Sequence, residues 1–349
     1  METDQTQRCL PYTFSKKRTA LMGTTRRGSF FSGNEPKSVP ARGSGACRED
    51  LTAPNEYGRV RKKDGRRELK AMLRIWQKTE KQELEPVGMG TAFPFLKEKN
   101  HVVSIIGGGG KTTLLYEMAG FGVKNKQKVL VTTSTHIYRP PKEWHDQSLE
   151  AVERKFRAGR AAIIGSACRN PEKLSMPEPE LFEAAREKAD LTLIEADGAK
   201  HLPCKAPAEH EPALLSCSAL VIGVTGLSAL GQPLGKGCFR AERAAELLGC
   251  TMEHHITEED LARLIASEQG QQKDLKGRTF YAVLHQYEEK KYREAAEKLV
   301  ELLRRQGIEH VLVTCATGNR RQSGENTNPW YGRAELPVRE AEEEWEPGE

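Results

Sequence analysis

The chain has 349 residues, of which 37% are hydrophobic and 30% are charged, and its formal net charge is +5. This length suits one large domain or two ordinary ones, and the apolar share excludes a wholly disordered or collagen-like chain. No stretch of sequence is long and apolar enough to span a bilayer, and the N-terminus lacks the apolar core of a secretory signal. The eight cysteines are scattered without a C-x-x-C pair, so we expect reduced thiols. We therefore expect a cytoplasmic protein without a membrane partner.

Charge is distributed unevenly along the chain. Residues 1–98 carry 20 Lys and Arg against 12 Asp and Glu, whereas residues 319–349 carry 4 against 8. Residues 1–65 lack apolar periodicity and are rich in Arg, Ser, Gly and Pro, so we expect a disordered basic arm. A nucleic-acid arm or an organelle transit peptide is an alternative, but the interleaved aromatic residues that would favour a nucleic-acid partner are missing. Another interpretation is that translation begins later, at Met72 or Met89.

Strand and helix patterns alternate over residues 99–318. This region follows a linker over 66–98, with a polar helix expected over 66–85, and precedes a disordered acidic tail expected over 319–349. Short β-branched apolar runs predict buried strands, and the amphipathic segments between them predict helices. The alternation favours an α/β fold with a mostly parallel sheet flanked by helices on both faces. The predicted strands are 102–106, 128–132, 161–164, 191–194, 220–224, 280–284 and 310–314, and the predicted helices are 112–124, 149–157, 179–188, 240–248, 258–267 and 288–306.

A glycine-rich loop follows the first predicted strand of this region. It consists of Gly107, Gly108, Gly109, Gly110, Lys111, Thr112 and Thr113. Glycines let the backbone approach a polyphosphate, and the N–H groups at the start of the following helix attract the anion. We expect Lys111 to bind the terminal phosphates and the Thr112 hydroxyl to ligate Mg²⁺. The loop has the short form G-x-x-G-K-T-T, and an ordinary glycine-rich turn is the alternative.

Two carboxylates follow the strand predicted over 191–194. Glu195 and Asp197 are two positions apart, which places them on one face of an extended chain. Because ligands bind at the carboxyl ends of parallel strands, we expect both carboxylates to face the glycine loop. Asp197 is the expected Mg²⁺ ligand, and Glu195 is the expected partner of metal-bound water or the base that orients the attacking water. A helix N-cap and a surface acid are the alternative.

Two further loops are expected at the same edge of the sheet. The first, residues 132–136, ends in His136, a candidate for positioning the nucleophile, although its Thr and Ser residues would also suit helix capping. The second, residues 199–212, is rich in proline and charge, and it suits either substrate contact or a solvated surface. The candidate substrate contacts are Lys200, Lys205, Glu209 and His210, together with Arg240 at the start of a predicted helix.

These motifs, together with residues 202–212 and 221–231, resemble the YqeC family, whose members are described as accessory proteins for selenium-dependent molybdenum hydroxylases or as selenium cofactor biosynthesis proteins. The resemblance spans residues 100–318 and implies a P-loop NTPase-like protein that uses Mg²⁺ and ATP or GTP. It also implies a selenium-dependent molybdenum hydroxylase, or its cofactor, as a partner. Similar proteins carry Asn-Lys/Gln-x-Asp where this chain has His285-Gln286-Tyr287-Glu288, so the choice of nucleobase stays open.

Three functions are compatible with these residues. The first is a Mg²⁺-dependent enzyme that hydrolyses a nucleoside triphosphate or transfers a phosphoryl group, with Lys111, Glu195 and His136 as catalytic residues. The second is an ATP-dependent amide ligase, because Mur ligases and folylpolyglutamate synthases share the spacing of the glycine loop. The third is a non-catalytic carrier that nucleotide binding switches.

Overall fold

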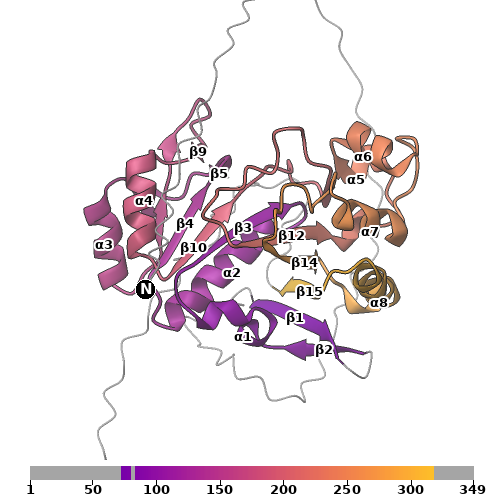
Figure 1. Ribbon diagram of the computed structural model, residues 1–349, viewed down its shortest axis with the longest axis horizontal. Coiled ribbons are helices and arrows are strands. Elements are labelled where there is room, and N and C mark those ends of the chain that lie inside the picture. The colour runs from indigo at the N-terminus through magenta and orange to yellow at the C-terminus, as the bar shows by residue number, and fades with distance from the viewer. Residues whose placement is uncertain (1–71, 80–82, 318–349) are drawn as a thin grey trace, which may run out of the picture. The chain divides into compact units, whose positions relative to one another are not determined.

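A ten-stranded sheet forms the centre of the protein in the computed structural model, which describes residues 72–79 and 83–317 (Figure 1). In spatial order its strands are β2 (Leu84–Val87), β1 (Met72–Lys78), β15 (His310–Thr317), β14 (Thr279–His285), β12 (Leu220–Gly226), β3 (His101–Gly107), β10 (Leu191–Glu195), β4 (Val129–Thr133), β7 (Ala162–Ile164) and β6 (His145–Asp146). Neighbours from β15 to β6 are parallel, whereas β1 is antiparallel to both β15 and β2. The mostly parallel α/β sheet expected from the sequence is thus confirmed.

The sheet has eight parallel strands in the described residues. Seven of them were predicted from the sequence, and β6 is the one that was not. Every residue of β4, β10 and β12 is buried, as is every residue of β3 after His101. A parallel strand with helices on both faces has no side in contact with water, so it reads as one apolar run rather than as an alternation. This is why the pattern was recognisable from sequence alone.

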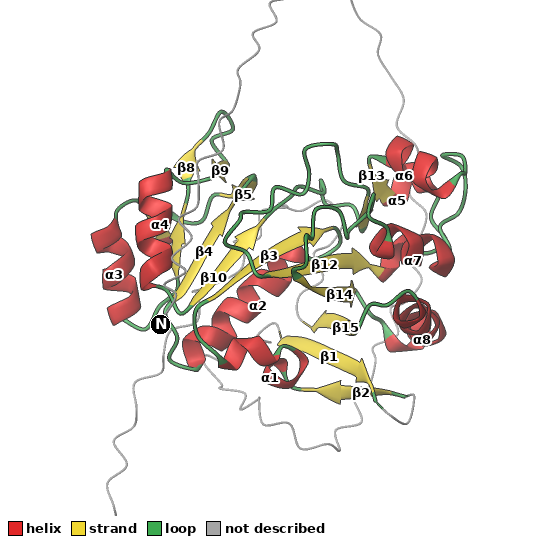
Figure 2. Cartoon of the chain, in the orientation of Figure 1, coloured by secondary structure: helices red, strands yellow, loops and turns green. Residues whose placement is uncertain are grey.

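Helices cover both faces of the sheet (Figure 2). The six predicted helices are confirmed, and α3 and α7 begin at side-chain caps supplied by Ser148 and Thr257. The helices are α1 (Met89–Ala92), α2 (Lys111–Lys124), α3 (Leu149–Arg157), α4 (Pro179–Lys188), α5 (Leu234–Gly237), α6 (Ala241–Leu248), α7 (Glu258–Ala266) and α8 (Glu289–Arg305), with 3-10 turns η1 (Pro94–Lys97), η2 (Lys142–Trp144) and η3 (Leu227–Ala229).

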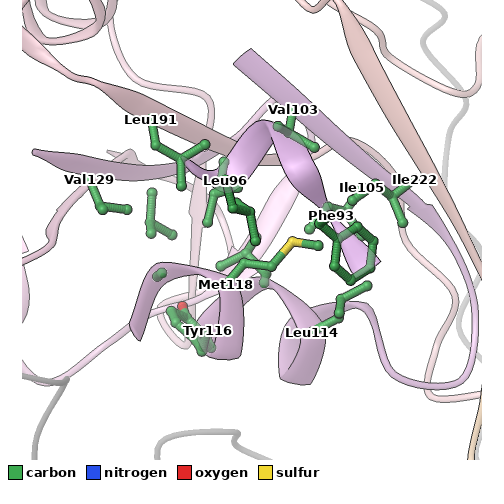
Figure 3. Packing of buried hydrophobic residues seen from close by; sticks show 14 of the residues in the cluster. Phe93, Leu96, Val103, Ile105, Leu114, Tyr116, Met118, Val129, Leu191 and Ile222 are labelled. Carbon is green, nitrogen blue, oxygen red and sulfur yellow. The ribbon is translucent and has the colours of Figure 1, made fainter. Parts of the chain in front are cut away.

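Each face of the sheet has its own apolar core. On one face, Leu114 and Met118 of α2 pack with Phe93 against Val103 and Ile105 of β3 (Figure 3). On the other face, α3 and α4 cover the part around β4 and β7, while α6, α7 and α8 cover the part around β14 and β15. Burial of one large apolar side chain contributes about 1.5–3 kcal/mol. The glycine loop between β3 and α2 is therefore held by two well-packed elements.

Two small sheets lie outside the central one. β5 (His136–Tyr138) pairs with β9 (Lys173–Ser175), which also pairs with β8 (Ser166–Ala167). β11 (Cys204–Lys205) is parallel to β13 (Cys238–Phe239), so it ties the loop after β10 to the segment that precedes α6.

The polar helix predicted over residues 66–85 is wrong, because the described part of this segment forms the strands β1 and β2. Ile75 is buried in the same core as α2, and the ring of Trp76 meets the ring of Tyr287 edge-on with centroids 4.8 Å apart. Successive side chains of β1 therefore enter opposite faces of the sheet, which is the period of a strand. Antiparallel pairing with β15 determines this outcome, and that pairing joins residues some 240 positions apart, for example Leu73 with Ala316.

Other expectations on domain organisation concern parts of the chain without described structure. The basic arm over 1–65 and the acidic tail over 319–349 lie outside the described residues. Within 72–79 and 83–317, none of the helices is long and apolar enough to cross a membrane, and the cysteines carry free thiols.

Candidate functional site

The glycine loop follows a backbone path that requires glycine. Gly107, Gly109 and Gly110 have φ angles of 93°, 74° and 145°, which residues with a side chain rarely adopt. A Cβ on Gly107 would lie 2.1 Å from the carbonyl oxygen of Val224 in β12. The loop is therefore confined by its own backbone geometry and by close contact with the neighbouring strand.

Two backbone amides of the loop bind other parts of the protein. The Gly107 amide donates to Asp197 Oδ2 at 2.9 Å, and the Gly108 amide donates to the Val224 carbonyl at 2.8 Å. The first amides of α2, from Lys111 onward, have no acceptor within the helix. Together with the positive end of the helix dipole, they form a place where an anion is stabilised.

Lys111 folds back over the loop. Its side chain is 6% exposed, and its Nζ donates to the Gly107 carbonyl at 2.6 Å and lies 3.2 Å from Asp197 Oδ1. The structure thus brings together the loop lysine and a carboxylate that is 86 positions later in the sequence. Asp197 Oδ1 is buried, and within the described residues its ion pair with Lys111 is not accompanied by a hydrogen bond of good geometry.

Glu195 contacts the hydroxyl that the sequence assigns to Mg²⁺. Thr112 Oγ1 donates to Glu195 Oε2 at 2.9 Å, while Thr113 is half-buried in the same turn of α2. Burial raises the pKa of Glu195, although the charge of Lys111 and the Thr112 hydrogen bond oppose this effect. The carboxylate paired with Thr112 is thus Glu195, whereas the expected metal ligand Asp197 faces Lys111 and the Gly107 amide.

A buried row of alternating charges leads away from the glycine loop. Lys205 Nζ lies 3.0 Å from Asp197 Oδ2 and 2.7 Å from Glu211 Oε2, and it donates to the Gly198 carbonyl at 2.7 Å. Glu211 Oε2 in turn lies 2.8 Å from Arg240 Nη1. Burial opposes ionisation of Glu211, but the hydrogen bond and charge of Lys205 outweigh it and lower the pKa of this carboxyl. We call Lys111, Asp197, Lys205, Glu211 and Arg240 the charge row.

The loop over residues 199–212 packs on the glycine loop. Its residues Lys200 and His201 have left-handed backbone angles, and the Gly226 amide donates to the Pro203 carbonyl at 2.7 Å. A Cβ on Gly109 would lie 2.8 Å from the same Pro203 carbonyl oxygen. The proline-rich loop is therefore a wall of the site rather than a remote surface segment.

The predicted substrate contacts divide into buried and exposed residues. Lys205 is buried and Arg240 is half-buried, whereas Lys200, Glu209 and His210 are exposed. Lys200 Nζ lies 5.3 Å from the ring centre of Phe239, which also stacks with the guanidinium of Arg240 at 4.4 Å. Cationic groups thus surround one aromatic ring at the outer end of the charge row.

The hydroxyl-rich loop after β4 is used mainly for structure. Thr133 Oγ1 donates to the Glu195 carbonyl at 2.7 Å, and Ser134 Oγ donates to the Ala213 carbonyl at 2.6 Å. These bonds fix the chain around Glu195. His136 is exposed in β5, and in the described ranges no hydrogen bond or ion pair connects it with Lys111 or Glu195.

Three polar residues near the loop were not identified from the sequence. Gln271 Nε2 donates to Thr225 Oγ1 at 2.7 Å, and Gln271 lines a small pocket with Gly107, Asp197 and Lys205. Lys273 Nζ donates to the carbonyls of residues 208, 209 and 211 and so fastens the proline-rich loop. The third residue, at the end of β14, is His285, whose ring lies against the glycine loop. The sequence signals for a role of His285 were its place at a strand end and its place in the segment that departs from similar proteins.

Comparison with known proteins links the chain to one group of sequences. The family model named YqeC, described as YqeC protein, matches residues 103–242. "Uncharacterized protein YqeC" of Escherichia coli (strain K12) is 32% identical over 184 residues, which cover 48% of this chain and 69% of that protein. No solved structure gives a significant match. The matched range contains the glycine loop, both carboxylates and the whole charge row.

Proposed function

The chain belongs to the YqeC family, and on that premise we propose that it binds a nucleoside triphosphate with Mg²⁺ at the glycine loop and hydrolyses it or transfers its terminal phosphoryl group. In this proposal the fold is a P-loop NTPase-like variant of the α/β class. Strand β3 carries the loop and lies between β10, which carries the carboxylates, and β12. Ligands of open α/β sheets bind outside the carboxyl ends of the strands, where these elements meet.

The observation that carries the proposal is the convergence of Lys111, Thr112 and Glu195 at a glycine loop. A lysine, a hydroxyl and a carboxylate around free helix amides are the groups that bind a phosphate chain and its magnesium ion. The hydrogen bond from Thr112 to Glu195 joins two oxygen atoms of the type that Mg²⁺ prefers. In this arrangement Glu195, rather than Asp197, is the carboxylate beside the expected metal position.

Each residue then has a distinct task. Lys111 exchanges the Gly107 carbonyl for phosphate oxygens, and the first amides of α2 bind the same phosphates. Thr112 and Glu195 would hold Mg²⁺ directly or through water, and the bound ion would supply positive charge that stabilises the phosphates. Asp197 binds the Gly107 amide and Lys205, so it fixes the start of the loop against the proline-rich segment. Catalysis would come mainly from positioning and charge stabilisation.

We further propose that this activity serves the maturation of selenium-dependent molybdenum hydroxylases or the synthesis of a selenium cofactor. Support comes from the family resemblance described above, carried by the glycine loop, the strand ending in Glu195 and the proline-rich loop. In the proposal the hydroxylase or its cofactor meets the exposed side of residues 199–212, where Lys200, Glu209 and His210 are accessible.

A nucleotide-switched carrier is a second candidate, and the charge row favours it. Lys111 is paired with Asp197, and Asp197 shares Lys205 with Glu211 of the proline-rich loop. A phosphate that draws Lys111 away would leave Asp197 with Lys205 as its cationic partner, beside the Gly107 amide. Nucleotide binding would then change the ion pairs of Glu211 and Arg240, although no bond of the nucleotide is broken.

Phosphate release distinguishes the two candidates. The full chain is incubated with Mg²⁺ and ATP or GTP, with and without a purified selenium-dependent molybdenum hydroxylase, and inorganic phosphate is measured. Release that the hydroxylase stimulates supports the enzyme, whereas tight nucleotide binding without release under either condition supports the carrier. Failure to bind either nucleotide contradicts both.

A further inference from the structure

A histidine at the carboxyl end of β14 lies against the glycine loop. His285 is 4% exposed. A Cβ built on Gly110 would lie 2.1 Å from His285 Cδ2 and 2.7 Å from His285 Nε2. The edge of the imidazole that carries Nε2 therefore faces the residue immediately before Lys111, at the N-terminus of α2.

The neighbouring strand β15 fixes the orientation of this ring. His285 Nδ1 is hydrogen-bonded to the hydroxyl of Thr314 at 2.7 Å, and Thr314 is fully buried in β15. The carbonyl of Thr314 also accepts from the Tyr287 amide at 3.0 Å, which holds the turn directly after His285. Both the side chain and the backbone of Thr314 thus determine where Nε2 points.

The far nitrogen of this imidazole, Nε2, has no hydrogen-bond partner in the described part of the chain. Among the residues that the structure describes, the Thr314 hydroxyl is the hydrogen-bond partner of His285, and it occupies Nδ1. Burial lowers the pKa of His285 to about 4, so at neutral pH the ring is uncharged and carries one proton. A ligand at the glycine loop would give Nε2 the hydrogen-bond partner that the described residues do not supply.

We propose that His285 is a phosphate-binding residue: with the Thr314 hydroxyl donating to Nδ1, the Nε2–H donates a hydrogen bond to a phosphate oxygen held beside Gly110. This inference rests on the proposed function. It adds a neutral donor from β14 to the charged donor Lys111 from α2. The phosphate would then be bound by residues of both β14 and α2. The contact with His285 would fix the orientation of the phosphate without adding positive charge.

A pair of amide substitutions tests the two nitrogens separately. In His285→Asn the side-chain amide replaces the position of Nδ1, so the contact with Thr314 can persist while the reach toward the loop is lost. In His285→Gln the amide reaches the position of Nε2. The probes are Mg·ATP and Mg·GTP, their affinity for the full chain is measured by calorimetry, and thermal unfolding is recorded for each variant.

We expect His285→Asn to bind the preferred nucleotide at least about tenfold more weakly than the wild type at a similar melting temperature, as for loss of a hydrogen bond to a charged group. His285→Gln should stay within about threefold of the wild type, on the same scale. Wild-type affinity in His285→Asn overturns the inference, as does an equal loss in both variants at unchanged melting temperature. If the wild type itself binds neither nucleotide, the proposed function fails and the inference fails with it.

Thr314 supplies a second test in case the substitutions at His285 unfold the chain. Thr314→Val removes the hydroxyl that orients the ring, and Thr314→Ser keeps it. Weaker nucleotide binding in Thr314→Val than in Thr314→Ser supports the inference. Equal affinities of these two variants contradict it.

Discussion

The two carboxylates after β10 have different surroundings although they are two residues apart. Glu195 is the last residue of the strand, and it contacts Thr112 in the first turn of α2. Asp197 lies beyond the strand end, where side chains no longer alternate between the faces of a sheet. It contacts the Gly107 amide, Lys111 and Lys205 instead. The sequence predicted that both would meet the loop and assigned the metal to Thr112 and Asp197, whereas the Thr112 hydroxyl contacts Glu195.

The gain in nucleotide affinity that Mg²⁺ provides should therefore depend on the side chains of Thr112 and Glu195 more than on that of Asp197. We expect Thr112→Val and Glu195→Gln to bind nucleotide in Mg²⁺ no more tightly than the wild type does in EDTA. Asp197→Asn should retain tighter binding in Mg²⁺ than in EDTA. Calorimetric titrations with and without Mg²⁺ measure this difference, and a Mg²⁺ effect that is lost only in Asp197→Asn would return the metal role to that residue.

The pH dependence of stability gives a second test of Glu195. Burial raises the pKa of Glu195 above its value in the unfolded chain. The folded state then binds this proton more tightly, so the contribution of Glu195 to stability falls as the pH rises from about 4.5 through the raised pKa. In Glu195→Gln this part of the pH dependence should be absent. Urea unfolding across that interval checks it, and parallel pH profiles for the two proteins would contradict it.

At the scale of elements, the charge row joins four segments of the chain. Lys111 belongs to α2, Asp197 follows β10, Lys205 belongs to β11, and Arg240 begins α6. The two carboxylate partners of Lys205, Asp197 and Glu211, are buried with it, and its side chain is only 1% exposed. A buried charge is stable only when its partners are present, because water cannot replace them.

Lys205→Met should therefore be strongly destabilising. It leaves Asp197 and Glu211 without their shared cation, and breaking a buried ion pair typically costs about 3–5 kcal/mol of the free energy of unfolding. Lys200→Met is the matched control, because Lys200 is exposed on the same loop. Urea unfolding compares the two variants. Equal, small losses would show that the charge row does not hold the loop.

Strand β1 is the element whose placement differs most from the expectation. Ile75 is 2% exposed in the core beneath α2, whereas its neighbour Arg74 is exposed. We expect Ile75→Ala to lower the free energy of unfolding by about 2–4 kcal/mol, as for other large-to-small core substitutions, and Arg74→Ala to have little effect. Similar unfolding curves for both variants would contradict the assignment of β1 to the sheet.

Across the whole molecule, the sequence predicted what depends on local pattern. The buried strands, the main helices and the loop from Gly107 to Lys111 have signals within a dozen residues. Strands such as β1, β5 and β13 are short or exposed on one side, and pairing with distant segments decides them. Three residues reach the site from segments far away in the sequence, namely Gln271, Lys273 and His285. The residue spacing around the glycine loop therefore does not predict them.

The proposed function depends on one property, the binding of a nucleoside triphosphate by Lys111. The most direct measurement is a calorimetric titration of Mg·ATP and Mg·GTP into the wild type, Lys111→Ala and the exposed-lysine control Lys236→Ala, each first shown to be folded by thermal unfolding. We predict one site in the wild type and in Lys236→Ala. In Lys111→Ala we predict an affinity at least about 10- to 100-fold weaker, since charged hydrogen bonds to phosphate are lost. Equal affinity in Lys111→Ala, or no binding of either nucleotide by the wild type, would contradict it.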